Sequence, residues 1–360
     1  MQTKITKLLG IEHPILMAAM AWVSNAEVVA AVSNAGGLGT LGPNAGARVV
    51  TTDVAETGKR LRAQIKRVRE LTDRPFAVNF VVGAAGLDKE FSEKCIDVGI
   101  EEGVPVAIVS QGNPMVHTER LKKAGMKVVH VCAAVAHAKK AEMAGVDAVV
   151  ASGTDGGGHS GFDQNTTFCL IPQVTDAVKI PVVAGGGVAD GRQLVAALAL
   201  GAEGVYIGTR FIATIENPAH ERYKESLLRS RDGGTIAIKH GSVGKSGAGN
   251  AGFTGERRGS LRILLTDKLR DIFIKNSGVV DFSKVAEAFS GPISMEKGGS
   301  ATAAASIYGD PNLPFWAAGQ GVGLIDEILS SGDVVKKIME EADRAQQKIR
   351  GIGAIKSSDK

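Results

Sequence analysis

The segment IPVVAGGGVADGRQLVAALALGAEGVYIG, residues 180–208, decides the fold because it contains one complete strand–helix–strand repeat. Residues 180–184 are apolar throughout and predict a buried strand, residues 190–200 predict a helix, and residues 204–208 predict the next strand. Strands that are apolar on both sides and alternate with helices are typical of a parallel sheet covered on both faces.

The same alternation runs through the chain that precedes this segment. We expect further strands within residues 13–20, 37–42, 74–80, 105–110, 126–131 and 147–152, and helices over residues 24–34, 53–71, 89–102, 115–124, 134–144 and 171–178. A glycine, the usual left-handed helix stop, follows five of the helices: Gly36, Gly103, Gly125, Gly145 and Gly201. Eight such units in about 210 residues predict an α/β fold, a TIM (β/α)8 barrel. A doubly wound open sheet has the same local pattern, so periodicity alone leaves it open.

The alternation ends near residue 214. We predict a (β/α)8 barrel with the ligand site over residues 1–214, an insertion or cap after the eighth strand over 215–315, and C-terminal helices packing on the barrel over 316–360. Those helices are expected over residues 322–329 and 333–351. The cap region contains glycine- and serine-rich runs at 245–250 and 298–300 and a group of basic residues, Arg229, Arg231, Lys239, Arg257 and Arg258.

Composition indicates an ordered globular chain. Its 360 residues are 44% hydrophobic and 22% charged, which is enough to bury a large core. The 42 Lys and Arg nearly balance the 38 Asp and Glu, and aromatic residues make up only 4%, so a nucleic-acid surface is not indicated. The three cysteines form no C-x-x-C pair, the histidines show no metal-ligand spacing, and no signal peptide or long apolar run is present. We therefore expect a cytoplasmic protein with no metal site and no membrane contact.

Two glycine-rich loops predict a phosphate site. In a TIM barrel the loops after the seventh and eighth strands often hold a phosphate. Here they are Gly185-Gly186-Gly187, which opens a helix, and Gly208-Thr209. Backbone N–H groups at such a helix entry point toward an anion, and a threonine hydroxyl adds a donor. A third loop, ASGTDGGGHSG over residues 151–161, places His159 among glycines that leave room for a ligand.

These residues resemble the nitronate monooxygenase family, formerly called 2-nitropropane dioxygenases, a group of FMN-dependent enzymes that also includes FMN-type enoyl-acyl-carrier-protein reductases. The resemblance rests on segments in family order: 14–20, Asn79, 151–161, 181–191, 197–202, 208–211 and 318–321. It implies FMN as cofactor, with the ring between the Ala19-Met20-Ala21 segment and His159. Further cofactor contacts are implied for Asn79, Ser152, Gly153, Gly158, Gly185, Gly186, Gly187, Gly208, Thr209 and Gln320.

The resemblance leaves two reactions open. The first is oxidation of alkyl nitronates with O₂, with His159 as the catalytic residue that orients the anionic nitro group. The second is an NAD(P)H-dependent reduction of an enoyl thioester or quinone, with NAD(P)H as a transient co-substrate and acyl carrier protein as a partner. Either role suits a group that titrates near neutrality. A third hypothesis, from another class, is a non-redox phosphate-binding barrel.

Other features of the sequence bear on these hypotheses. The family commonly has glutamate where this chain has Asp155-Gly156, so the loop is expected to sit differently. His130 and Cys132 end the fifth strand and could face the pocket, although such residues are more often packed in a core. The substrate is expected to be a small molecule, and a homodimer stays open as the commonest assembly.

Overall fold

The computed structural model describes residues 1–83, 85–161, 163–239, 260–274, 296, 298–310 and 316–352. Its centre is an eight-stranded parallel sheet in the order β1-β9-β8-β6-β5-β4-β3-β2. The strands are β1 (Ile15–Met17), β2 (Gly39–Leu41), β3 (Phe76–Val81), β4 (Val106–Ser110), β5 (Lys127–Cys132), β6 (Ala148–Ser152), β8 (Val182–Gly185) and β9 (Gly204–Ile207). All eight lie where the apolar runs predicted strands.

Backbone hydrogen bonds bring the two edges of this sheet together. The Leu38 N–H donates to the Ile15 carbonyl at 2.9 Å, and the Met17 N–H donates to the Leu38 carbonyl at 2.8 Å. These bonds join β1 to the residue before β2, so the sheet is a nearly closed barrel and not an open one. The predicted TIM-barrel fold is confirmed.

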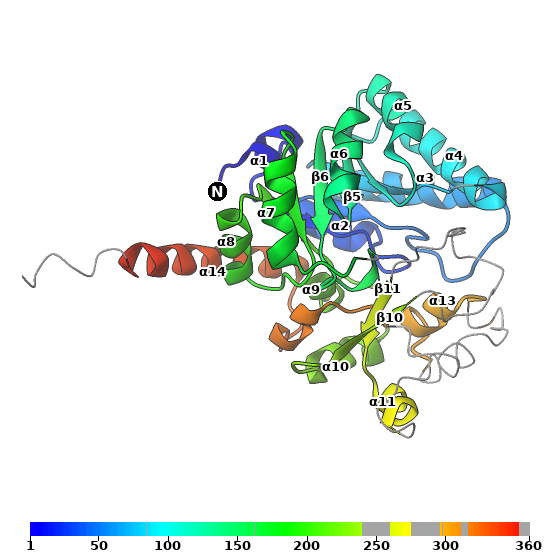
Figure 1. Ribbon diagram of the computed structural model, residues 1–360. Coiled ribbons are helices and arrows are strands. Elements are labelled where there is room, and N and C mark those ends of the chain that lie inside the picture. The colour runs from blue at the N-terminus through cyan, green and yellow to red at the C-terminus, as the bar shows by residue number, and fades with distance from the viewer. Residues whose placement is uncertain are drawn as a thin grey trace, which may run out of the picture.

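Seven helices lie between the strands on the outside of the barrel (Figure 1). They are α2 (Ala26–Asn34), α3 (Val54–Leu71), α4 (Gly86–Glu101), α5 (Thr118–Lys123), α6 (Val135–Met143), α7 (Thr167–Ala177) and α8 (Gly191–Ala199). Asn25 caps α2 through its side chain, and Asp190 caps α8 together with Gln193. The short turn η1 (Pro114–Val116) replaces the first part of the helix expected over 115–124.

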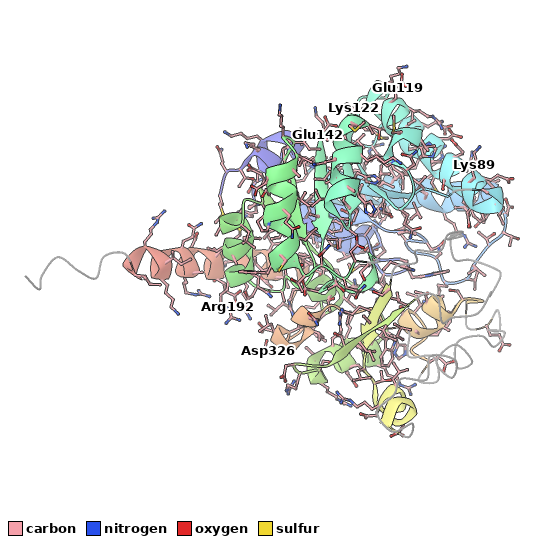
Figure 2. The ribbon with its side chains drawn as sticks, viewed as in Figure 1. Lys89, Glu119, Lys122, Glu142, Arg192 and Asp326 are labelled. Atoms are coloured by element: carbon pink, nitrogen blue, oxygen red, sulfur yellow. The ribbon has the colours of Figure 1, made fainter. Side chains whose placement is uncertain are left out.

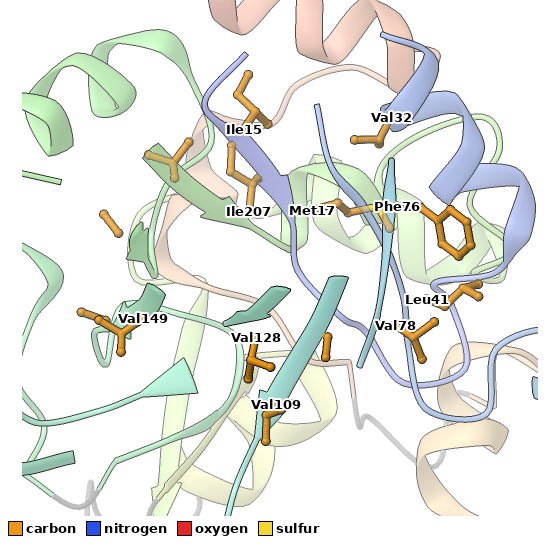
Figure 3. Close-up of a cluster of buried hydrophobic side chains, with 14 of the residues drawn as sticks. Ile15, Met17, Val32, Leu41, Phe76, Val78, Val109, Val128, Val149 and Ile207 are labelled. Atoms are coloured by element: carbon orange, nitrogen blue, oxygen red, sulfur yellow. The ribbon is translucent and has the colours of Figure 1, made fainter. Parts of the chain in front are cut away.

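Alternating strand residues divide the core into two layers. Outward side chains such as Met17, Val78 and Val149 pack against the helices in one large cluster (Figure 3). Inward side chains such as Leu16, Ile108 and Val183 fill the barrel. Ile5 and Leu9 of α1 (Lys4–Leu9), a helix that the sequence pattern did not predict, join this inner cluster beside the first residue of β9. The amino-terminal end of the barrel is thereby closed.

The C-terminal helix α14 (Ser331–Ile352) completes the outer ring by packing between α8 and α2. A side chain at Gly191 would lie 2.2 Å from the Ala342 backbone nitrogen, so α8 and α14 touch backbone to backbone. The helix expected over 322–329 is wrong. The chain forms the short 3₁₀ turn η4 (Gln320–Leu324) and is extended at Ile325, because Gly321 and Gly323 weaken helix formation and Leu329 bridges to Thr214.

The described parts of residues 215–315 lie together on one side of the barrel (Figure 1). They include α10 (Glu221–Arg229), β10 (Thr235–Lys239), β11 (Ser260–Leu264), α11 (Asp267–Ile274) and α13 (Ala301–Ser306), and follow the short helix α9 (Thr209–Ile212). Strand β11 pairs antiparallel with β10 and with β7 (Gly158–Ser160). Arg229 and Arg231 are exposed, whereas Arg257, Arg258 and the 245–250 run lie outside the described residues. Within the described ranges, every helix is too short or too polar to cross a membrane.

Candidate active site

The carboxyl ends of the strands place a set of small and polar residues inside the barrel mouth. By alternation from the inner core, these are Asn79, Ser110, Ser152, Gly185 and Tyr206. Asn79 is buried, and its side-chain amide donates to the Ile108 carbonyl at 2.9 Å and to the Ser110 hydroxyl at 3.1 Å. The mouth therefore has a polar layer above a core that is apolar except for the buried Thr40.

The loops after β6 and β8 pack against each other through their backbones. The Gly153 N–H donates to the Gly185 carbonyl at 2.9 Å, and the Thr167 hydroxyl lies 3.0 Å from the carbonyls of Gly185 and Gly186. Gly186 and Gly187 have φ angles of +102° and +73°, which side-chain-bearing residues rarely adopt. Both the bend and the close packing explain the glycines in these loops.

Three backbone N–H groups at the ends of two neighbouring strands have no protein acceptor. Within the described part of the chain, no hydrogen bond occupies the N–H groups of Gly187, Gly208 and Thr209, whereas the Gly186 N–H is directed at β9 by the pairing of Gly185 with Tyr206. They follow β8 and β9, which are neighbours in the sheet. Such a group of free donors at adjacent strand ends is suited to an anionic ligand.

The C-terminal segment reaches the same loops. The Gly319 N–H donates to the Thr209 hydroxyl at 3.0 Å, and the Gln320 N–H donates to the Asp155 carbonyl at 2.8 Å. A side chain at Gly321 would lie 2.3 Å from the Gly187 carbonyl oxygen. The segment thus connects the loops after β6, β8 and β9. The N–H groups of Gly319 and Gln320 make these connections.

The segment after β1 borders the opposite side of Gly208. The N–H groups of Ala18, Ala19 and Met20 donate to the Ile207 carbonyl, the Tyr206 hydroxyl and the Ser24 hydroxyl at 2.8, 2.9 and 2.9 Å. A side chain at Gly208 would meet only Ala18 and Met20, at 3.5 Å or more. The next turn ends in Trp22, which is buried with a φ of +72°, a strained conformation for a bulky residue.

His159 lies on a strand and not in a free loop. It is the central residue of β7, directly opposite Leu261 of β11, and its side chain is exposed. The hydroxyls of Ser160 and Ser260 are 2.7 Å apart and join the same two strands. The cap region therefore holds the position of His159, which the sequence pattern did not predict.

Asp155 connects the loop to its surroundings. Its carboxylate accepts a hydrogen bond from the Thr167 N–H. The buried Arg262 of β11 donates from Nε to the Thr154 carbonyl at 2.7 Å. Burial lowers the pKa of the Arg262 guanidinium, and the nearby charge of Asp155 opposes this shift. The aspartate that departs from the family pattern therefore anchors the start of α7 and faces a cation of the cap.

The predicted site residues thus fall into three groups. The structure brings together Gly153, Gly185, Gly186, Gly187, Gly208, Thr209 and Gln320 at the ends of β6, β8 and β9, with Ala19, Met20 and Ala21 beside them. Asn79 and Ser152 lie in the polar layer of the mouth, and Gly158 and His159 on β7. The sequence did not predict Tyr206 as a site residue, because a single tyrosine in an apolar strand has the pattern of a core residue. Its place two residues before Gly208 was the available signal.

His130 and Cys132 point away from the mouth. Val129 belongs to the inner cluster, so its neighbour His130 faces the helices, as does Cys132. Burial lowers the pKa of the His130 imidazole to about 4, with a smaller contribution from His137. Its Nδ1 is buried and has no hydrogen-bond partner among the described residues. His130 is therefore a neutral core residue and not a site residue.

This burial predicts an acid-sensitive stability. Because the folded pKa lies below the unfolded value of 6.5, stability is full above that pH and is lost as pH falls toward 4. We expect His130 to cost the wild type about 2 kcal/mol of unfolding free energy between about pH 7 and about pH 5. His130→Leu, which removes no hydrogen bond, should lessen the loss by that amount in urea unfolding. Equal losses in both proteins would contradict this assignment.

A pocket of about 310 Å³ lies outside the barrel mouth, between α8, η4 and α14. Figure 2 shows Arg192 and Asp326, two of its lining residues, on the same side of the molecule. Three cations and three carboxylates line it in all, so its charge favours neither anions nor cations: Asp190, Arg192, Arg210, Asp326, Lys337 and Glu341. The strand-end loops, and not this pocket, therefore define the candidate site.

Comparison with known proteins identifies the family. The family model described as nitronate monooxygenase matches residues 2–341, which include both the barrel and the cap region. The chain belongs to the nitronate monooxygenase family. It is therefore an enzyme, an oxidoreductase, and enzymes of this family are flavin-dependent in general.

Three relatives of this nitronate monooxygenase family member are informative. FabK from Thermotoga maritima is 35% identical, covers 98% of this chain and 99% of its own, and has a TM-score of 0.79. A (3aS,4S,5R,7aS)-5-hydroxy-7a-methyl-1-oxo-octahydro-1H-indene-4-carboxyl-CoA dehydrogenase from Mycobacterium tuberculosis is 31% identical over 95% of this chain and 96% of its own. A probable nitronate monooxygenase from Staphylococcus saprophyticus is 36% identical over 66% of this chain and 75% of its own.

Proposed function

We propose that the chain binds FMN in the barrel mouth and uses it to oxidise alkyl nitronates with O₂. The family model supports the reaction, since it spans the barrel and the cap. The observation that carries FMN binding is the group of three N–H donors without protein acceptors at Gly187, Gly208 and Thr209. The phosphate of a mononucleotide matches such a group.

The residues present fit the cofactor. The phosphate would be held by the loops after β8 and β9, and the ring would lie near Asn79 and the Ala19–Ala21 segment. Gly208 leaves open space beside Met20, which a ligand could occupy. When bound, FMN would accept two electrons from the substrate and pass them to O₂.

His159 would act on the substrate. An exposed imidazole can donate a hydrogen bond to the substrate and so orient the anionic nitro group. Backbone pairing of β7 with β11 fixes the position of the His159 backbone, to which this imidazole is attached. General acid–base chemistry requires a precisely positioned side chain. Paired strands hold a residue more firmly than a loop does.

The open space at Gly208 gives a prediction that separates folding from binding. Its φ is −106°, and an added methyl group would meet protein atoms only at 3.5 Å or more. Gly208→Ala should therefore leave the thermal unfolding temperature of the FMN-free protein unchanged. The methyl group would enter the open space beside Ala18 and Met20, which this proposal assigns to the cofactor, and should weaken FMN binding by about tenfold or more.

Gly332→Ala is the matched control for this substitution. Its added methyl group would also have no neighbour closer than 3.8 Å, and the residue lies in α14, away from the strand-end loops. Fluorescence titration with FMN should give the wild-type dissociation constant for this control. A wild-type constant for Gly208→Ala as well would place the cofactor elsewhere.

A second reaction is favoured by the full-length relatives. FabK and the CoA dehydrogenase match 98% and 95% of this chain, whereas the staphylococcal relative matches 66%. The match to FabK favours an NAD(P)H-dependent reduction of an enoyl thioester, with NAD(P)H as a transient co-substrate, and the match to the CoA dehydrogenase favours a thioester substrate. The thioester would be carried by coenzyme A or an acyl carrier protein.

Anaerobic mixing of the FMN-loaded enzyme with each electron donor separates the two reactions. Bleaching of the flavin by an alkyl nitronate, followed by recovery of colour on admission of O₂, is the expected result. Bleaching by NADH or NADPH but not by a nitronate would overturn nitronate oxidation in favour of the reductase. A small apolar nitronate and a crotonyl thioester are suitable probe substrates.

A further inference from the structure

Tyr206 is a polar residue of the barrel mouth whose role the proposed reaction does not include. It lies near the end of β9, level with Leu16 of β1 and Gly185 of β8. Its sequence neighbours Val205 and Ile207 are fully buried in the outer layer, so Tyr206 points to the inside of the barrel. The side chain is nevertheless partly exposed. Because helices cover the outside and α1 closes the lower end, this exposure is toward the mouth.

The hydroxyl of Tyr206 accepts a hydrogen bond but donates none to the described residues. Its oxygen accepts the Ala19 N–H at 2.9 Å. Among the described residues, no acceptor lies within hydrogen-bond distance of its own proton. Burial raises the pKa of this phenol to about 12, so the proton is retained at neutral pH. The phenol is thus a donor without a protein partner, beside the segment that borders Gly208.

We propose that Tyr206 is a positioning residue of the FMN site. Its hydroxyl oxygen accepts the hydrogen bond from the Ala19 N–H, and its O–H donates a hydrogen bond to the flavin ring. The inference rests on the proposed FMN binding. Carbonyl oxygens and ring nitrogens of the isoalloxazine are acceptors of the required kind. The same hydroxyl would then join the strand-end segment to the cofactor, and Ala19, Tyr206 and the ring would form one hydrogen-bonded unit.

Tyr206→Phe tests both halves of this role, because it removes only the hydroxyl oxygen. Fluorescence titration of the FMN-free protein should show FMN binding weakened by about tenfold, since one donor is lost and the Ala19 N–H is left without its acceptor. The reduction potential of the bound flavin should become more negative, because a hydrogen-bond donor stabilises the negative charge that the ring gains on reduction. Thermal unfolding of the FMN-free variant checks that it folds.

Tyr308→Phe is the matched control. Tyr308 lies in the cap region, where the centre of its ring is 5.3 Å from the Arg48 guanidinium carbon. This variant should keep the wild-type affinity and potential. Unchanged affinity and potential in Tyr206→Phe would overturn the proposal, and weaker binding with an unchanged potential would overturn the donation to the ring. Failure of the wild type itself to bind FMN would instead overturn the proposed function on which the inference rests.

Discussion

His159→Ala is expected to keep FMN bound and to reduce turnover by about 10²–10⁴-fold, the usual contribution of a positioned acid–base group. The cofactor should remain because the N–H groups proposed to hold its phosphate belong to other loops. β7 should also remain in place, because its pairing with β11 is made by backbone atoms and by the Ser160 and Ser260 hydroxyls. The loss should therefore appear in kcat and not in the FMN dissociation constant.

His137→Ala is the control for this experiment. His137 is exposed on α6, and alanine is at least as favourable in a helix. Steady-state kinetics should give wild-type rates for this variant. Full activity of His159→Ala would refute the role of His159, and loss of FMN from it would move His159 from substrate to cofactor binding.

Of the substitutions proposed here, Gly186→Ala is expected to have the largest effect on folding. It should lower the free energy of unfolding by about 2–4 kcal/mol. The residue has a φ of +102°, and a methyl group would lie 2.7 Å from the Thr167 hydroxyl and 2.9 Å from the Gly153 carbonyl. Both atoms belong to the contact between the loops after β6 and β8, so the substitution must separate them. FMN binding should be lost together with the geometry of the free N–H groups.

Gly125→Ala separates backbone strain from this steric clash. Gly125 has a comparable φ of +83°, but a methyl group there would have no neighbour within 4 Å. It should cost only about 1 kcal/mol and leave FMN binding unchanged. Urea unfolding measures both variants. If the two substitutions lowered the free energy of unfolding equally, close packing of the loops would not explain why residue 186 is a glycine.

Much of the fold could be predicted because the barrel repeats a local pattern. Each buried parallel strand is apolar in sequence, and some helices begin at a residue that caps them, as at Asn25 and Asp190. The closing contact between Ile15 and Leu38 could not be read from periodicity, because an open sheet has the same local pattern. Strand count favoured the barrel, and the hydrogen bonds establish it.

The site was predicted less completely because its contacts join distant segments. The pairing of β7 with β11 joins residues about 100 positions apart, such as Ser160 and Ser260, and β7 is too short to have a strand pattern. Gln320 was predicted by resemblance alone. The outward direction of His130 depends on the register of β5, and a shift of one residue would have reversed it.

Titration of the FMN-free chain with FMN tests the central claim of an FMN site at the strand ends most directly. We expect one FMN to remain with each chain after gel filtration, and much less with Gly208→Ala. A chain that stays colourless at saturating FMN, or a Gly208→Ala variant that binds as the wild type does, would contradict the account.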